Sequence, residues 1–175
     1  MDNLIRKIEA ISLSNDEVME LINGKANLIQ YPQLYGINSL DEILEPYGAC
    51  VILYLTRQNY GHWCCVFKLD NNSVEFFDPY GLFPDEELKF RMDPNFRKRS
   101  HEDIPMLSYL LDSSPYNLSF NHHKFQKRIS DVKTCGRHTA MRLICRNISL
   151  DDYINLFTNN KYDADFLVTM LTAYI

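Results

Sequence analysis

Three extended segments follow one another within residues 49–78, which read ACVILYLTRQNYGHWCCVFKLDNNSVEFFD. The segments 49–55, 63–69 and 73–78 are rich in Val, Ile, Phe, Tyr and Trp, and short polar stretches separate them, as is typical of strands joined by turns. We therefore predict an antiparallel meander. Because the first segment has apolar residues at both odd and even positions, we expect it to be a central strand with both faces covered.

Segments with helical periodicity and helix start or stop signals flank these strands. The capping-box pattern of residues 39–42 should open a short helix. We expect a further short strand at 117–120 and other helices at 2–10, 15–24, 84–90, 102–111, 136–146, 150–158 and 163–173. The helix 136–146 should carry Ala140, Leu143 and Ile144 on one side. This order indicates an α+β fold, and the absence of repeats and linkers indicates that residues 1–175 form a single domain.

The composition is that of an ordinary folded domain, with 46% hydrophobic and 23% charged residues among 175. No apolar run approaches the roughly 20 residues of a membrane span, and the N-terminal residues lack the pattern of a signal peptide. An odd number of cysteines, five, indicates a reducing compartment, so we expect a cytoplasmic protein with no membrane association. The net charge of −5 gives no indication of nucleic-acid binding, and we expect a monomer without a cofactor.

Three short segments contain residues that can do chemistry: 60–65 (YGHWCC), 75–81 (EFFDPYG) and 134–138 (TCGRH). Each also has a purely structural interpretation. The sequence Asp-Pro-Tyr-Gly is what a type I turn selects, a His beside a Trp is commonly packed in a core, and Cys-Gly can simply mark a helix start. Together, however, the segments supply a thiol, a base and an acid, the groups that nucleophilic catalysis by sulfur requires.

The loop between the second and third strands determines whether the base and the acid can meet. If it is the three residues 70–72, Cys64 is opposite Asp78, and His62 and Asp78 share one face, two residues out of step. Such diagonal positions lie about 7–8 Å apart, within reach of a His–carboxylate hydrogen bond. A two-residue loop would put them on opposite faces, so the catalytic interpretation predicts the wider loop or a bulge.

Cys135 directly precedes a predicted helix. The unpaired N–H groups of a helix start favour a thiolate and can hold a developing oxyanion, and a side-chain amide should supplement them. Gln126 is the best candidate for that amide. The other cysteines fall in apolar strands or inside a helix, where we expect structural roles: Cys50, Cys64, Cys65 and Cys145.

Four elements of the sequence, taken in order, resemble the adenovirus-protease and ubiquitin-like-protease superfamily of cysteine peptidases, clan CE. They are Gly-His-Trp, a strand ending in Phe-Asp-Pro-Tyr-Gly, a Gln, and Thr-Cys-Gly-Arg-His. The sequence is most similar to compact members encoded by large DNA viruses. The resemblance implies a papain-like, circularly permuted fold with a central, mostly antiparallel sheet flanked by helices. It implies that Cys135 is the nucleophile and His62 the general base. It further implies that Asp78 orients His62 and that Gln126 helps to form the oxyanion hole.

The sequence departs from the superfamily pattern at two points. Pro79 stands where a Ser is common after the acid, which should matter little because the carboxylate is the orienting group. The separation of nine residues between Gln126 and Cys135 is longer than usual. Asn121 is therefore an alternative amide for the oxyanion hole.

The implied activity is that of an endopeptidase that cleaves peptide or isopeptide bonds after small, Gly-rich sequences, with Trp63 and Gly136 in contact with the substrate. We expect the substrates to be viral structural precursors, and a viral chain would act in the host cytoplasm or the virion. Two alternatives remain: removal of ubiquitin or SUMO-like proteins from host conjugates, and a non-catalytic binding module on the same fold.

Metal binding is a further alternative, because five residues have side chains that commonly ligate zinc: His62, Cys64, Cys65, Cys135 and His138. Their spacing is unfavourable. Neighbouring cysteines on a strand point to opposite faces, and the sequence contains no C-x-x-C pair. We therefore expect no metal site.

Overall fold

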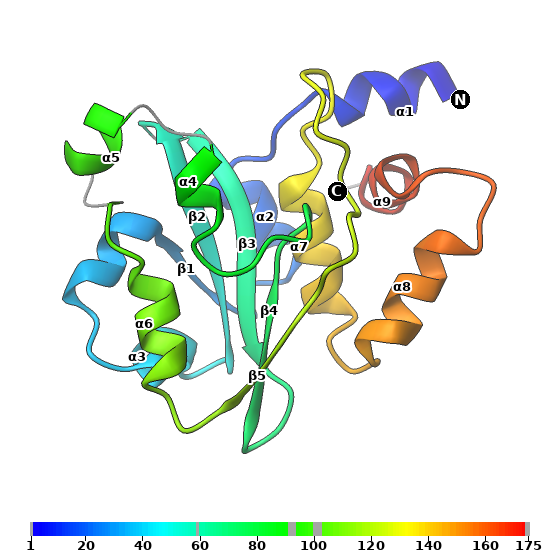
Figure 1. Ribbon diagram of the computed structural model, residues 1–175. Coiled ribbons are helices and arrows are strands. Elements are labelled where there is room, and N and C mark those ends of the chain that lie inside the picture. The colour runs from blue at the N-terminus through cyan, green and yellow to red at the C-terminus, as the bar shows by residue number, and fades with distance from the viewer. Residues whose placement is uncertain (1, 59, 91–93, 100–102, 174–175) are drawn as a thin grey trace.

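A computed structural model describes residues 2–58, 60–90, 94–99 and 103–173. A single mixed sheet has the strand order β1-β2-β3-β4-β5 (Figure 1). The strands are β1 (Asn27–Gln30), β2 (Ala49–Arg57), β3 (Tyr60–Lys68), β4 (Ser73–Phe77) and β5 (Asn117–Phe120). The antiparallel meander β2-β3-β4 and the strand β5 are confirmed, whereas β1 was not predicted. Because β1 runs parallel to β2 and β5 parallel to β4, the sheet is mixed rather than mostly antiparallel.

The helical segments of the described residues are α1 (Asp2–Glu9), α2 (Asn15–Leu21), the 3-10 helix η1 (Tyr31–Gly36), α3 (Leu40–Leu44), α4 (Glu87–Phe90), α5 (Pro94–Arg99), α6 (Met106–Asp112), α7 (Cys135–Ile144), α8 (Leu150–Thr158) and α9 (Ala164–Thr172). Most agree with the predicted helices apart from shifted ends. Neither η1 nor α5 was predicted. The longest, α7, has ten residues, and no helix within the described part of the chain has the length and apolar character needed to cross a membrane.

Two predicted helices are shorter than expected for identifiable reasons. The segment 84–90 becomes helical only at α4, because Asp85 adopts a left-handed backbone conformation with φ of 65°. The segment 102–111 becomes α6, which begins directly after Pro105, and residue 102 lies outside the described residues. At α3 the helix forms, but the Ser39 side chain makes no capping hydrogen bond.

Helices cover both faces of the sheet, and the predicted burial of β2 on both sides is confirmed (Figure 1). Odd-numbered residues of β2 and β3, such as Val51 and Cys65, share a core with α2, α7, α8 and α9. Even-numbered residues, such as Ile52 and Cys64, share a second core with η1, α3 and α6. The helix that begins at Cys135 is thus fixed against the strand that carries His62, by packing and by a 3.0 Å hydrogen bond from the Thr139 hydroxyl to the Trp63 carbonyl.

Candidate active site

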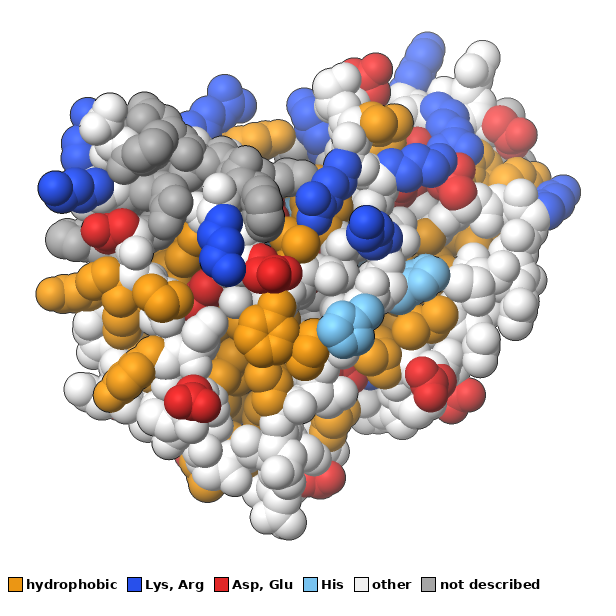
Figure 2. All heavy atoms as spheres, in the orientation of Figure 1, with side chains coloured by type: hydrophobic (Ala, Val, Ile, Leu, Met, Phe, Trp, Pro, Cys, Tyr) orange, Lys and Arg blue, Asp and Glu red, His pale blue; other side chains and the backbone are white. Residues whose placement is uncertain are grey.

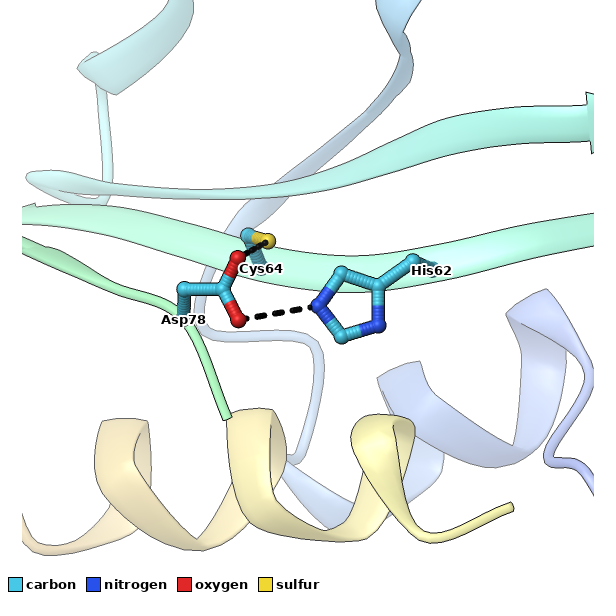
Figure 3. Close-up of side chains that lie close together, drawn as sticks. All are labelled: His62, Cys64 and Asp78. Carbon is cyan, nitrogen blue, oxygen red and sulfur yellow. Dashed lines mark hydrogen bonds and ion pairs between the residues drawn. The ribbon is translucent and has the colours of Figure 1, made fainter. Parts of the chain in front are cut away.

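The turn between β3 and β4 sets which side chains of the two strands lie together. The Leu69 N–H donates to the Ser73 carbonyl at 2.9 Å, and Cys65 pairs with Phe77. This is the register predicted for the three-residue loop. As a result, Nε2 of His62 lies 3.0 Å from Oδ1 of Asp78, as Figure 3 shows. Both side chains are buried, with 2% and 1% of their surfaces exposed.

Asp78 is held in place by hydrogen bonds to both its side chain and its backbone. The Tyr80 N–H donates to Oδ1 at 2.6 Å, and the Cys64 thiol donates to Oδ2 at 3.5 Å (Figure 3). The Asn121 side chain accepts from the Asp78 N–H and donates to its carbonyl, each at 2.9 Å. The Gly81 N–H also donates to the Asp78 carbonyl, so Asp78 begins a turn and contacts His62 at the same time.

His62 experiences opposing electrostatic effects. Burial lowers its pKa because it disfavours the charged ring, but the adjacent Asp78 carboxylate raises the pKa through its charge and its hydrogen bond. The nearby Cys135 side chain and the Glu87 carboxylate act in the same direction, and together these groups raise the pKa of His62 to about 10. The imidazole is therefore protonated at neutral pH, and its ring stacks on Tyr80 with 4.5 Å between centroids.

Cys135 is the first residue of α7, where backbone N–H groups have no partner within the helix. It lines a cavity of about 300 Å³ together with His62, Tyr80 and Gln126. Nδ1 of His62, the nitrogen that does not face Asp78, makes no close hydrogen bond among the described residues.

Gln126 lies in the wall of this cavity and is buried. Its backbone N–H donates to the Pro79 carbonyl at 2.9 Å, which ties its loop to the turn after β4. The side-chain Nε2 donates to the Val132 carbonyl at 3.1 Å, while Oε1 has no partner among the described residues. The loop 127–133 accommodates the long separation between Gln126 and Cys135. The alternative amide, Asn121, is occupied with Asp78 and is absent from the cavity lining.

Trp63 and Gly136, the expected substrate contacts, lie behind the cavity rather than in its lining. Trp63 is on the opposite face of β3 from His62 and is 4% exposed. A Cβ atom at Gly136 would lie 3.1 Å from the Trp63 ring, so the two residues pack the start of α7 closely against the sheet. The role that the structure shows for them is packing.

A second buried histidine–carboxylate pair lies behind Cys135. Asp165, on α9, accepts from the Thr134 hydroxyl at 2.5 Å and is 3.1 Å from Nε2 of His138. Its other oxygen accepts from the Lys127 N–H at 3.0 Å. Asp165 thus joins the start of α7 to the loop that carries Gln126. Sequence analysis missed it because it lies 30 residues from Cys135 within an ordinary helical pattern.

The structure brings only part of the possible metal-ligand set together. Ligand atoms of His62, Cys64 and Asp78 all lie within 4.8 Å of one another. Cys65 is on the opposite face of β3, and His138 is paired with Asp165. Burial raises the pKa of the Cys64 thiol well above its usual range, which opposes the thiolate that a metal requires. A positioned His–Asp pair with a thiol donor therefore describes these three residues better than a metal centre does.

No family model matches the chain. Among solved structures, the central domain of the uncharacterized Lpg1148 protein from Legionella pneumophila aligns with a TM-score of 0.43 and 14% identity, covering 93% of this chain and 94% of that one. In sequence, the uncharacterized protein V9 of the Sputnik virophage is 40% identical over 172 residues, which are 96% of this chain and 98% of that protein. The chain thus has a viral relative along nearly its whole length.

Proposed function

The chain belongs to the family of the Sputnik virophage protein V9, and we propose that it is a cysteine peptidase that cleaves peptide or isopeptide bonds after small residues. One observation carries this proposal. A single cavity contains a thiol at a helix start and a histidine whose far nitrogen is bonded to a buried carboxylate. These are the groups that nucleophilic catalysis by sulfur requires, in the order thiol, base and orienting acid.

The arrangement of helix and sheet also supports the proposed relation to the adenovirus-protease and ubiquitin-like-protease superfamily. The helix α7 begins at the thiol and packs on the sheet, while β3 and the end of β4 carry His62 and Asp78. A papain-like, circularly permuted fold would have the same arrangement, and this agreement supports the proposal.

In the proposed reaction, Sγ of Cys135 attacks the scissile carbonyl carbon as a thiolate and forms a C–S bond. The His62 imidazolium then gives its proton to the leaving amine as the C–N bond breaks. Neutral His62 next takes a proton from the water molecule that attacks the thioester carbon. The C–S bond then breaks, which releases the carboxylic acid and restores the Cys135 thiolate beside protonated His62. Asp78 keeps the ring oriented and stabilises its protonated form throughout.

The negative oxygen that forms during attack would be held at the start of α7. Backbone N–H groups there are unpaired within the helix, and Gln126 lies on the same cavity wall. Removing one such donor typically costs about 2.7–4 kcal/mol of transition-state stabilisation. Because one Nε2 hydrogen of Gln126 is bonded to Val132, the other is the hydrogen available for the oxyanion.

The direct test is covalent labelling with a Gly-Gly peptide that ends in an electrophilic vinyl sulfone, followed by mass spectrometry. We expect one adduct, located at Cys135, and none with Cys135→Ala. Asp78→Asn should slow labelling by about 10²-fold, because the histidine loses the charge that orients it and keeps it protonated.

Cys145→Ala is the matched control, since Cys145 is a half-buried thiol at the other end of α7. This variant should label at the wild-type rate. Adducts spread over several cysteines, or equal rates for wild type and Asp78→Asn, would contradict the proposal. A non-catalytic binding module would bind a Gly-Gly peptide without forming an adduct or a cleavage product.

We further propose that the substrates are viral structural precursors, and the viral relative supports this choice. Removal of ubiquitin or SUMO-like proteins from host conjugates is the alternative. Incubation of the protein with ubiquitin and SUMO fusions, beside peptides from the structural proteins of the source virus, distinguishes them. Cleavage confined to the fusions would reverse the assignment.

A further inference from the structure

The charged side chains in the cavity wall share one sign. Besides His62, the charged residues that line it are Arg128 and Lys133, and no Asp or Glu is among the lining residues. This local excess contrasts with the net charge of −5 for the whole chain. Figure 2 shows that Lys and Arg side chains also gather over the loop that leads into α7. A concave site of one charge sign attracts ligands of the opposite sign.

Both cavity cations lack an acidic partner within the described ranges. Among the residues that the structure describes, neither Arg128 nor Lys133 forms an ion pair, whereas the adjacent Lys127 contacts Asp163 at 2.8 Å. Ion pairs also engage Arg6, Lys68 and Arg142. Arg128 and Lys133, for which the described part of the chain offers no carboxylate partner, thus line the cavity in which a peptide substrate would lie.

The guanidinium of Arg128 is held close to the catalytic base. It lies 5.0 Å from the centroid of the Tyr80 ring, and Tyr80 stacks in turn on His62. A second ring in the cavity wall, Tyr60, carries the guanidinium of Arg57 at 4.4 Å. Aromatic stacking limits the freedom of an arginine and leaves its planar N–H groups available to a carboxylate.

We propose that this cavity selects substrates that carry a carboxylate side chain close to the scissile bond, bound by Arg128 and Lys133. This specificity rests on the proposed peptidase function. An Arg fork can bind a carboxylate with two parallel hydrogen bonds, and Lys133 adds a second positive charge. An exposed pair of charges changes affinity by up to about fivefold, so two cations should give a preference of about tenfold.

The test uses a set of Gly-Gly peptides in which each position flanking the cleaved bond is Glu, Gln or Lys in turn. We expect at least one position where kcat/KM is about tenfold higher for Glu than for Lys, with Gln between them. The preference should shrink as salt rises, because salt screens exposed charges. In the double variant Arg128→Glu, Lys133→Glu, the Glu-to-Lys ratio should reverse.

The control is Lys25→Glu, a reversal of charge at one exposed lysine near the opposite end of α7, and it should keep the wild-type ratio of kcat/KM for Glu over Lys peptides. Binding of the same peptides to Cys135→Ala, measured by fluorescence anisotropy, gives a readout independent of turnover. Cleavage with equal kcat/KM for Glu and Lys peptides at every position would overturn the charge preference without contradicting the peptidase function. If no peptide is cleaved, the peptidase function itself fails.

Discussion

The pKa of His62 is raised because nearby groups, foremost the Asp78 carboxylate, together outweigh the cost of burying a charge. Asp78 is held beside the ring because Tyr80 and Cys64 donate hydrogen bonds to its oxygens while Asn121 fixes its backbone. Asn121, which sequence analysis offered as an oxyanion donor, is therefore a positioning residue for Asp78. The sequence predicted that His62 and Asp78 share a face only if the loop has three residues, and the structure shows that register. The contacts of Tyr80 and Asn121 with Asp78 depend on the tertiary fold, and no local pattern indicates them.

The charge on His62 should make the free energy of unfolding depend on pH. Its pKa is raised from the ordinary 6.5 to about 10, so protonated His62 contributes its full stabilisation below pH 6.5 and loses it as pH rises toward 10. Urea unfolding of wild type and His62→Gln across this range should show a difference in unfolding free energy that falls steadily. Asp78→Asn should remove this pH dependence of the unfolding free energy. If the difference in unfolding free energy between wild type and His62→Gln stays constant with pH, the raised pKa of His62 is wrong.

Among the elements, β3 begins three residues earlier than predicted because its first residues pair closely with β2. Gly61 pairs with Leu55, and His62 pairs with Tyr54. The polar residues 58–61 read as a loop, but a glycine there allows close approach of the two backbones. This pairing extends β3 far enough to include His62, which fixes the base to the sheet rather than to a mobile loop.

Gly61→Ala should therefore damage both stability and the site. A Cβ atom at this position would lie 1.7 Å from the Tyr54 carbonyl oxygen, so the two strands must separate. We expect a loss of about 2 kcal/mol or more in unfolding free energy, together with slower labelling of Cys135. Gly36→Ala is the control, because nothing lies within 4 Å of its added Cβ, and it should change stability by less than about 0.5 kcal/mol.

Across the whole molecule, a buried ion pair connects α7 to the sheet. Arg142 donates to both carboxylate oxygens of Glu75, on β4, at 2.7 and 2.8 Å, and both side chains are at most 1% exposed. Arg142 also donates to the carbonyls of Cys145 and Ile148, which fixes the chain between α7 and α8. Of the apolar residues predicted on one side of this helix, Ala140 and Leu143 are buried, whereas Ile144 is 49% exposed and the charged Arg142 occupies the interior.

Arg142→Met should destabilise the protein by about 3–5 kcal/mol, because it leaves the Glu75 carboxylate buried and unpaired. Replacing both partners, as Glu75→Met with Arg142→Met, should recover part of that loss, since no buried charge then remains. Thermal or urea unfolding of the two single variants and the double variant measures this coupling. A double variant less stable than both single variants would show that the pair's carbonyl contacts, rather than its charges, dominate.

The sequence by itself determined the strands of the meander and most helices, because these depend on local apolar patterns, but it left the register open between two loop lengths. It also singled out His62, Gln126 and Cys135, which line one cavity in the structure, and Asp78, which is bonded to His62. Only the tertiary structure decided that β1 and β5 add in parallel, that Trp63 and Gly136 pack behind the cavity, and that Asp165 supports the loop beside Cys135. These features arise from contacts between segments far apart in the chain, whose residues carry no local sign of the partner they meet.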